Sequence, residues 1–447
     1  MANVVLVGAQ WGDEGKGKII DLLSFLFALI IRFSGGCNAG HTVYTEDGVK
    51  VGSHMIPCGI DKENYIGAGV YFDLDRFCSE FDETTTTLGR EPVVYIDKLC
   101  PVWTDYHGLL EQWGELCRGK DRIGTTGRAI ALIAAIRTMR CGIHVGDLVG
   151  SKEDLLKQLT LLHNTWLPNL IALQSCMEFH AEQKPSEEKE EFYRRLKKLQ
   201  FPSPIQVRNR LLKNVDRIRS MVCDTRHQIN EAVKRGQKVL GEGAQATLLD
   251  GRWGTVPYVS SGDSVSAGAE INTGVTVFRK AVRIKVFKVG PTRVGEGPFP
   301  GEIWDRKKAE LFPKLRPELF VEGEAKQRFL RTMLAKINNG TVSAAQRSQY
   351  YQVLGDERGA TTKRGRSVGD FNLPLMYYSI ELDQADYACL TRLDMLSGLK
   401  KIPVIVGYKF HGKVLPYGQL PYPRDLDKVE TIIEYWDGWD ENILGCS

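Results

Sequence analysis

Six short apolar runs recur along the chain, with longer stretches of helical periodicity between them. The runs occupy residues 3–9, 28–33, 238–244, 282–290, 388–394 and 402–408. Most of them are continuous rather than alternating, which is typical of parallel strands covered by helices on both faces. The pattern predicts an α/β fold with one large, mostly parallel sheet flanked by helices. Ligands of such sheets bind beyond the carboxyl ends of the strands, where several runs end in Gly, Thr or Asp.

Two segments have a different pattern, with helical periodicity and many charges. Residues 151–235 predict a helical subdomain, and residues 303–352 predict a helical insertion. No Gly/Ser-rich or Pro-rich linker divides the chain, so residues 1–447 are expected to form a single domain that carries these insertions. Residues 19–31 are apolar but too short to span a bilayer, and we interpret them as a buried helix that runs into a strand.

Composition narrows the possible function classes. The chain has 447 residues, of which 43% are hydrophobic and 26% charged, and a net charge of +4, as is ordinary for a soluble enzyme. The densest basic cluster, at residues 361–366, is too short for a nucleic-acid interface and suits a small anion. The cysteines lack paired spacing and no signal peptide precedes the first strand, so a cytoplasmic location is expected. Neither a nucleic acid nor a membrane is an expected partner.

The first apolar run leads into a glycine-rich loop, "VGAQWGDEGKGK" at residues 7–18. Glycines and lysines in such a loop are typical of phosphate binding, although a loop of this kind alone also fits a plain tight turn. Asp13 and Glu14 set it apart from the usual phosphate loop. A carboxylate beside phosphates needs a cation, so Asp13 suggests a Mg²⁺ ligand, and next to a substrate it could also act as a general base.

A second loop of small residues, "SGGCNAGHT" at residues 34–42, follows the second apolar run. It presents Asn38 and His41. A polar turn with a surface histidine is the usual reading of such a segment. Two glycine-rich loops after neighbouring strands, one with an aspartate and one with a histidine, favour a functional site instead.

These loops and four further segments resemble the signature segments of adenylosuccinate synthetase. In chain order the segments are "QWGDEGKGK", "GGCNAGHT", "IGTTGR", "GEGAQATLLD", "TRVGEGPFPGE" and "GATTKRGR". The resemblance is close over residues 3–150 and 238–302 and looser over 355–408. It implies a P-loop NTPase-like fold and a carbon–nitrogen ligase of purine biosynthesis that joins IMP to L-aspartate. GTP is then the co-substrate and Mg²⁺ the cofactor, and the reaction passes through 6-phosphoryl-IMP.

The resemblance also implies catalytic roles. Asp13 would take the N1 proton of IMP and bind Mg²⁺, and the backbone oxygen of Gly40 would complete the metal shell. His41 would hydrogen-bond the phosphates, and Lys16 would neutralise charge on the moving phosphoryl group. Gln245 would contact the 6-oxygen of IMP, although without the family it reads equally well as a polar residue in a turn.

The binding residues that the resemblance implies form three sets. For IMP they are Asn38, Thr126, Arg140, Gln245, Ser260 and Arg364. For GTP they are Gly12, Asp13, Glu14, Gly15, Lys16, Gly17, Lys18, Gly40, His41, Thr42, Arg366, Arg392, Leu393 and Asp394. For L-aspartate they are Ala360, Thr361, Thr362, Lys363, Arg364, Gly365 and Arg366. Arg140 matches an arginine that crosses to the partner subunit's site in the family, so a homodimer is expected.

The chain also departs from the family pattern. Residues 127–134 are apolar and helix-prone, Asp370 stands where a tryptophan is usual, and Arg392 stands where a lysine is usual. The chain ends without a counterpart of the usual C-terminal segment, which predicts a more open nucleotide site and a weaker preference for GTP. Two alternatives stay open. One is a specialised paralogue that uses another purine nucleotide, against which Asp13 argues. The other is a nucleotide-binding regulator with weak turnover, against which the joint presence of the catalytic residues argues.

Overall fold

The computed structural model describes residues 2–44, 48–118, 125, 127–182, 201–293, 295–304, 317–357 and 366–443. Its centre is an eight-stranded sheet in which every neighbouring pair of strands is parallel, as the apolar runs predict. In spatial order the strands are β13 (Tyr387–Thr391), β9 (Val282–Lys288), β1 (Val4–Gly8), β8 (Val239–Glu242), β2 (Leu29–Arg32), β5 (Glu63–Ile66), β6 (Val94–Asp97) and β7 (Val222–Cys223). The predicted α/β class is confirmed.

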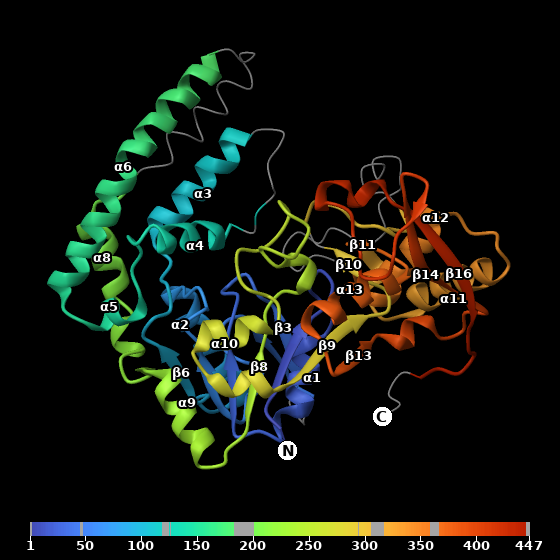
Figure 1. Ribbon diagram of the computed structural model, residues 1–447, viewed down its shortest axis with the longest axis horizontal. Helices are drawn as coiled ribbons and strands as arrows, with labels where there is room; N and C mark the ends of the chain where they lie inside the picture. Colours follow the sequence, from blue (N-terminus) through green and yellow to red (C-terminus); the bar gives the residue numbers. More distant parts are fainter. Residues whose placement is uncertain are drawn as a thin grey trace.

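Helices flank this sheet, as Figure 1 shows. The helices of the described chain, including those that lie away from this sheet, are α1 (Lys16–Ser24), α2 (Leu74–Leu88), α3 (Asp105–Arg118), α4 (Ile130–Thr138), α5 (Val145–Val149), α6 (Lys152–Glu182), α8 (Pro204–Leu212), α9 (Thr225–Lys234), α10 (Ala267–Thr273), α11 (Glu324–Asn338), α12 (Ala344–Gly355) and α13 (Leu373–Asp383). The apolar stretch at residues 19–31 is a helix followed by a strand, α1 and then β2, as predicted. The expected burial of the helix is wrong in part, because Ile20 is buried whereas Leu22 is 63% exposed. The apolar segment at residues 127–134 enters helix α4.

The central strands are apolar throughout because both faces of the sheet are covered. Every residue of β1 is buried. Val5 and Val7 pack in one core cluster with side chains of α9 and α10. Val4 and Leu6, which point to the opposite face, pack in another cluster with α1. A strand buried on both sides cannot show the alternation of a half-exposed strand, and this is the physical origin of the continuous apolar runs.

The last apolar run lies outside the large sheet. It forms β14 (Lys401–Phe410), which is parallel to β12 (Phe371–Asn372) but antiparallel to β15 (Lys413–Val414) and β16 (Glu430–Asp437). The expectation of one more parallel strand is therefore wrong for this run. Val404 and Ile405 of β14 are fully buried in different core clusters. A continuous apolar run predicts a strand that is buried on both faces, but it does not predict to which sheet that strand belongs.

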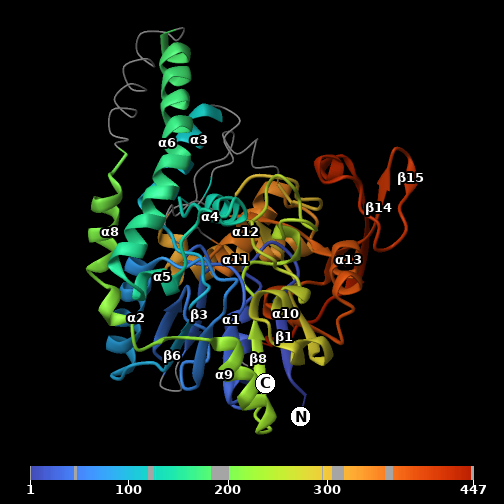
Figure 2. The same ribbon diagram turned by 60° about the vertical axis from the view of Figure 1, so that its left-hand side comes forward.

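The two predicted helical segments have different surroundings. Residues 151–235 include α6, α8 and α9, and also β7, which joins the main sheet. The start of α6 is anchored, since Leu155 and Leu159 share a core cluster with Phe72 and Phe77. Residues 303–352 include α11 and most of α12. In Figure 1, α3 and α6 project at one end of the molecule, while β14, β16 and α11 lie at the other end. Figure 2 shows the projection of α6 from a second side.

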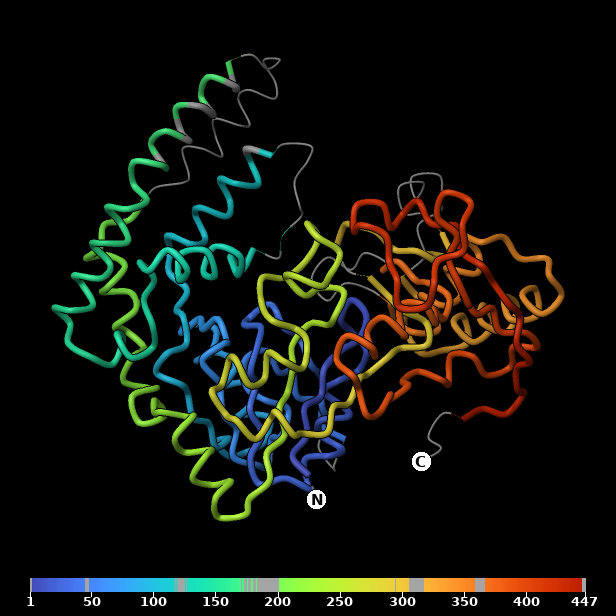
Figure 3. Tube along the Cα trace, in the orientation of Figure 1, coloured from blue at the N-terminus to red at the C-terminus, as the bar shows by residue number. Residues whose placement is uncertain are grey.

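Two short pairs of strands complete the part of the chain that the structure describes. β3 (His41–Tyr44) and β4 (Lys50–Ser53) form an antiparallel hairpin directly after the second glycine-rich loop. β10 (Thr292–Arg293) pairs with β11 (Ser367–Val368). Figure 3 follows the chain after β8 as it passes over the middle of the molecule, between the projecting helices and the C-terminal sheet. Over the described ranges, no helix is long and apolar enough to cross a membrane.

Candidate active site

The first glycine-rich loop connects β1 to α1 and ends in an open helix N-terminus. Gly12, Asp13 and Gly15 all have positive φ angles, of 89°, 61° and 83°. Asp13 is a non-glycine residue held in this left-handed region, which is uncommon and marks a constrained loop. Gly15 is the N-cap of α1, and no side chain caps the helix there. The first backbone N–H groups of α1 are thus available to an anion such as phosphate.

Glu14 supports this loop from the inside. Its side chain is fully buried, and it accepts hydrogen bonds from the backbone N–H groups of Gln10 (3.1 Å) and Gly12 (2.8 Å). Its other oxygen lies 2.8 Å from the Nζ atom of Lys16, which is also buried. A Cβ atom on Gly8 would lie 2.6 Å from that carboxylate, so the glycine is needed for close approach. The structure places Glu14 and Lys16 facing each other beneath the loop.

Asp13 lies on the outer side of the loop, where its side chain is about a third exposed. It forms an ion pair with Arg366, which lies 3.2 Å from the buried carboxylate of Glu357. Glu357 in turn pairs with Lys288 at the end of β9. Burial lowers the pKa of Lys288, and Glu357 opposes that effect. Arg366, which the sequence predicts to contact the nucleotide and aspartate, is thus in direct contact with Asp13, the predicted general base.

His41 begins β3 and lies over a buried charge network. Its Nδ1 atom lies 2.6 Å from a carboxylate oxygen of Glu242 at the end of β8. The same oxygen lies 2.5 Å from the guanidinium of Arg32 at the end of β2. Burial and the Arg32 charge lower the pKa of His41 to about 4. Burial alone would raise the pKa of Glu242, but Arg32 and His41 hold it at about 2. Glu242 is therefore ionised and His41 neutral at pH 7.

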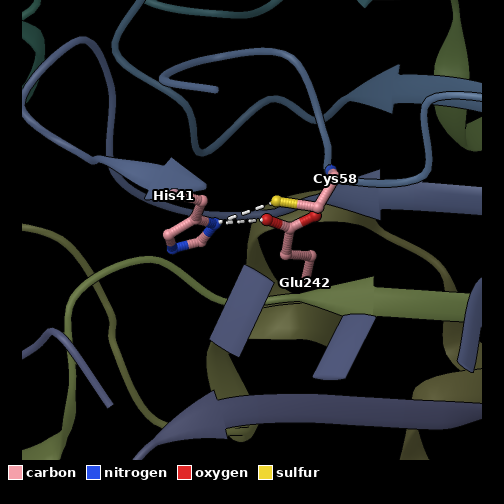
Figure 4. Close-up of side chains that lie close together, drawn as sticks. All are labelled: His41, Cys58 and Glu242. Atoms are coloured by element: carbon pink, nitrogen blue, oxygen red, sulfur yellow. Dashed lines mark hydrogen bonds and ion pairs between the residues drawn. The ribbon is translucent and has the colours of Figure 1, made fainter. Parts of the chain in front are cut away.

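Cys58 completes this cluster, which Figure 4 shows. Its Sγ atom lies 3.3 Å from Nδ1 of His41, and its backbone N–H donates to Glu242 (2.8 Å). The donor atoms of His41, Cys58 and Glu242 are close enough together to hold a metal ion. Arg32 already neutralises Glu242 and approaches Nδ1 of His41 within 3.1 Å. Burial also keeps the pKa of the Cys58 thiol high. The cluster is thus a hydrogen-bonded charge network rather than a metal centre.

Three residues that the sequence assigns to IMP carry buried oxygens that lack a hydrogen-bond partner within the described structure. They are Oδ1 of Asn38, Oε1 of Gln245 and Oγ of Ser260. Gln245 is held at a positive φ of 54°, and its Oε1 lies 3.2 Å from the position that a Cβ on Gly35 would take. Leaving a buried polar atom unpaired costs free energy, so these three side chains are suited to binding a ligand.

The end of β13 touches the first loop. Thr391 donates a hydrogen bond from Oγ1 to the backbone oxygen of Glu14 (2.6 Å). The next residue, Arg392, has a positive φ of 62°, and its Nε atom lies 4.0 Å from a carboxylate oxygen of Asp394. Leu393 begins a short 3-10 helix. The predicted guanine-reading segment is thus placed beside the predicted phosphate loop.

The remaining predicted residues have different environments. Lys18, Gly40 and Thr42 are exposed around the two loops. A Cβ on Gly17 would lie 3.0 Å from the Cβ of His41, so the loops are in contact. Arg140 is exposed just after the end of α4. Seven predicted positions lie outside the described residues, namely Thr126, Ala360, Thr361, Thr362, Lys363, Arg364 and Gly365. Arg366 is described.

Sequence reasoning missed four charged residues that organise the site, namely Arg32, Glu242, Lys288 and Glu357. Three of them stand inside the apolar runs that become β2, β8 and β9. A charge in a strand that is buried on both faces needs a partner, and this signal was available in the sequence. Glu357 had no such signal, because it follows helix α12 at the edge of a basic loop.

These features define a nucleotide-handling enzyme of the α/β class, with a glycine-rich loop, an acidic residue and an imidazole at the carboxyl ends of parallel strands. The sequence model of the adenylosuccinate synthetase family matches residues 5–447, and the chain belongs to this family. It is a carbon–nitrogen ligase that joins IMP to L-aspartate, with GTP as co-substrate and Mg²⁺ as cofactor.

Two relatives illustrate the similarity in sequence. The adenylosuccinate synthetase of Vibrio vulnificus (strain YJ016) is 35% identical over 452 residues, which cover 99% of this chain and 89% of the relative. That of Rhodococcus jostii (strain RHA1) is 32% identical over 450 residues, with the same two coverages. These findings favour the ligase over the paralogue and the regulator that the sequence left open.

Two solved structures illustrate the similarity in fold. The structure of fully ligated adenylosuccinate synthetase from Plasmodium falciparum has a TM-score of 0.72 at 27% identity, covering 100% of this chain and 91% of that chain. The succinoaminodeoxyadenylate synthetase of cyanophage S-2L has a TM-score of 0.50 at 20% identity, covering 87% and 84%. The second likeness concerns the fold alone.

Proposed function

We propose that this chain performs the ligation where the two glycine-rich loops meet the loop after β8. One observation carries the proposal: the unpartnered buried oxygens of Asn38, Gln245 and Ser260 lie in segments that border the loop of Asp13. The loop after β8 contacts the first loop directly, since the N–H of Leu248 donates to the backbone oxygen of Gln10 (2.9 Å). A nucleotide that accepts hydrogen bonds from the amide and hydroxyl groups of these three side chains would thus lie beside Asp13.

In the proposed first step, Asp13 accepts the N1 proton of IMP. The electron pair left on the base makes the 6-oxygen a nucleophile, and this oxygen attacks the γ-phosphorus of GTP as the bond to GDP breaks. Gln245 donates from its amide to the 6-oxygen. Lys16 and the N–H groups at the start of α1 carry the charge of the transferred phosphoryl group. In the second step, the amine of aspartate attacks C6, phosphate leaves, and the amine loses a proton.

Asp13 and Gly40 fit a magnesium ion that is shared with phosphates. Mg²⁺ in proteins binds through one or two carboxylate or carbonyl oxygens and fills its other positions with water and substrate phosphate. The carboxylate of Asp13 is partly exposed, and among the described residues none other than the chain neighbours of Gly40 has an atom within 4 Å of the position of a Cβ on Gly40. When bound there, the ion would neutralise charge on the phosphates. Arg366 would have to share or leave the Asp13 carboxylate.

Three further aspects of the proposal extend beyond the site. The segment at residues 360–366 would bind L-aspartate, because arginines grip carboxylates with paired hydrogen bonds. The chain would act as a homodimer in which Arg140 reaches the IMP phosphate of the partner site, which its exposed position permits. It would work in the cytoplasm with neither a nucleic acid nor a membrane as partner. The free thiols of the described cysteines suit a reducing compartment.

An isotope experiment tests the order of steps. IMP labelled with ¹⁸O at the 6-position, L-aspartate, Mg²⁺ and GTP are incubated with the purified chain, and the released phosphate is analysed by mass spectrometry. The label should appear in the phosphate, because the 6-oxygen leaves C6 bonded to phosphorus. Unlabelled phosphate during product formation would contradict the mechanism. Gln245→Leu serves as a comparison, and it should lower kcat without changing the fate of the label.

A further inference from the structure

The cluster beneath His41 contains a carboxylate that the ligation mechanism does not use. Glu242 is fully buried at the end of β8, and it is hydrogen-bonded on both oxygens. One oxygen accepts from the backbone N–H of Cys58 (2.8 Å), and the other contacts Arg32 and Nδ1 of His41. Arg32 is fixed as well, because it donates to the backbone oxygens of His54 (3.0 Å) and Ile56 (3.3 Å).

The geometry determines which nitrogen of His41 carries the proton. Nδ1 lies 2.6 Å from an oxygen of Glu242, which is a hydrogen-bond distance. An unprotonated Nδ1 would place its lone pair against a carboxylate at that distance, which is repulsive. Arg32 (3.1 Å) and the Cys58 thiol (3.3 Å) also approach Nδ1, but the contact with Glu242 is the shortest of the three. The proton therefore lies on Nδ1, and Glu242 accepts it. Figure 4 shows the other ring nitrogen on the side of the imidazole that faces away from Glu242 and Cys58.

We propose that Glu242, braced by Arg32, is a positioning residue that fixes the ring rotation and tautomer of His41, so that Nε2 is the ring nitrogen presented to the phosphates. This inference rests on the proposed contact of His41 with phosphate. A carboxylate behind an imidazole limits rotation of the ring and sets the role of the far nitrogen, as it does behind catalytic and metal-bound histidines. Glu242 itself touches neither substrate nor nucleotide in this arrangement.

A double-mutant cycle separates positioning from a merely structural role. Glu242→Gln keeps the size of the side chain and removes its charge. It should lower kcat by about 10- to 100-fold, the usual effect of losing such a supporting carboxylate, and leave KM for IMP and aspartate within about threefold. His41→Asn should lower kcat by at least as much. In the His41→Asn background, Glu242→Gln should have little further effect, because the residue acts through His41.

The outcomes distinguish this inference from the proposed function. A full additional loss of kcat in the double variant would overturn the positioning role. An unchanged kcat in His41→Asn would refute the catalytic contact of His41, and with it the inference. Because Glu242→Gln leaves Arg32 buried without its carboxylate, the variant could fold poorly. A measurement on the unmodified protein therefore decides the tautomer independently.

That measurement is ¹⁵N NMR of the whole chain labelled at its histidines. The His41 signals are assigned by their absence from the spectrum of His41→Asn. Long-range ¹H–¹⁵N correlation distinguishes a protonated from an unprotonated ring nitrogen, so at pH 7.5 His41 should give the pattern of a neutral ring protonated at Nδ1. A ring protonated at Nε2 alone would overturn the inference even if every kinetic expectation held.

Discussion

Replacing Glu14 with Gln should destabilise the protein, although the residue lies in the loop that we propose binds phosphate. Gln keeps an oxygen that can accept from the N–H groups of Gln10 and Gly12, but it presents an amide to the ammonium group of Lys16, 2.8 Å away in the native pair. Lys16 is only 3% exposed, so its charge would stay buried without a partner. Breaking a buried ion pair by removing one partner costs about 3–5 kcal/mol. We expect the lower end, about 3 kcal/mol, since Lys16 can move toward solvent.

The neighbouring carboxylate provides a matched control with the opposite behaviour. Asp13 is 34% exposed and pairs with Arg366, which is 20% exposed. A partly exposed pair contributes about 0–1 kcal/mol, so Asp13→Asn should change the free energy of unfolding by no more than that. Its turnover should fall by about 10² to 10⁴-fold from the lost general base alone, and further if a metal ligand is also lost.

Urea unfolding followed by tryptophan fluorescence, with the rate of adenylosuccinate formation, tests the pair of variants. Glu14→Gln should lower the urea midpoint strongly, whereas Asp13→Asn should leave it nearly unchanged and lose activity. If Glu14→Gln kept its stability within about 0.5 kcal/mol, the range of ordinary surface changes, the inward support role of Glu14 would be wrong. Equal losses of stability in both variants would also refute the reasoning.

Four further predictions follow from the site and the core. Arg364→Leu should raise KM for aspartate far more than KM for IMP or GTP, and an equal effect on all three would indicate a structural loop. Mixed Arg140→Leu and Asp13→Asn subunits, each inactive alone, should regain activity, because one hybrid site holds both native residues; no recovery despite subunit exchange would contradict a shared site. Burial lowers the pKa of His107 to about 3, below its unfolded value, so its contribution to stability is complete above about pH 6.5 and declines as the pH falls. His107→Asn should therefore flatten the loss of stability below pH 6.5 by up to about 1.4 kcal/mol per pH unit, and an unchanged slope would count against this. Asp394→Asn should reduce the preference for GTP over ATP.

Much of the fold was predictable because burial leaves a simple pattern. Strands covered on both faces are apolar at every position, and this property located the strands of the main sheet that carry the two loops. The same property could not assign β14 to a sheet. Val404 and Ile405 are buried on opposite sides of β14, as are Val4 and Val5 in β1. Which strands become neighbours depends on the path of the chain between them, and the apolar pattern carries no record of that path.

The sequence predicts candidate residues that can be recognised by their type and local motif. It does not predict residues whose role depends on a partner that is distant in the sequence. Asp13 and His41 stand out because they occur in two glycine-rich loops that follow neighbouring strands, a combination that a plain turn does not need. The inward orientation of Glu14 was not predictable, since sequence spacing does not tell which of two adjacent carboxylates points into the loop. The pairing of Glu242 with His41 joins residues 201 positions apart. The parallel register of β2 and β8 places Arg32 beside Glu242, and the separate hairpin of β3 and β4 carries His41 to them, which sequence spacing does not show.

Asp370 shows how the structure explains a departure from the family pattern. It is buried, at a position where the resemblance predicts a tryptophan. Arg347 of α12 donates to both of its oxygens, at 2.6 and 2.9 Å. Burial raises the pKa of Asp370, and Arg347 opposes that effect. This bidentate ion pair holds the segment around Asp370 against α12.

If Asp394 reads guanine, as the sequence predicts, the choice between GTP and ATP should depend on how far Asp394 is shielded from water. Guanine offers two donors to a carboxylate, the N1–H and the 2-amino group, and adenine offers neither in that arrangement. The side chain of Asp394 is 27% exposed, and Arg392, which is 38% exposed, lies 4.0 Å away and offsets part of its charge. Each hydrogen bond to a charged group contributes about 1.5–3 kcal/mol when enclosed, so two partly solvated bonds should together contribute about 2–3 kcal/mol. That corresponds to a GTP preference of roughly 30- to 150-fold in kcat/KM, well below the 10⁴-fold or more of a fully enclosed polar site.

ITP, which retains N1–H and lacks the 2-amino group, should fall between GTP and ATP. In Asp394→Asn one acceptor remains and the preference should drop below about tenfold, one hydrogen bond being worth that much. Equal use of GTP and ITP, or a preference for ATP in the native chain, would show that Asp394 does not read the base.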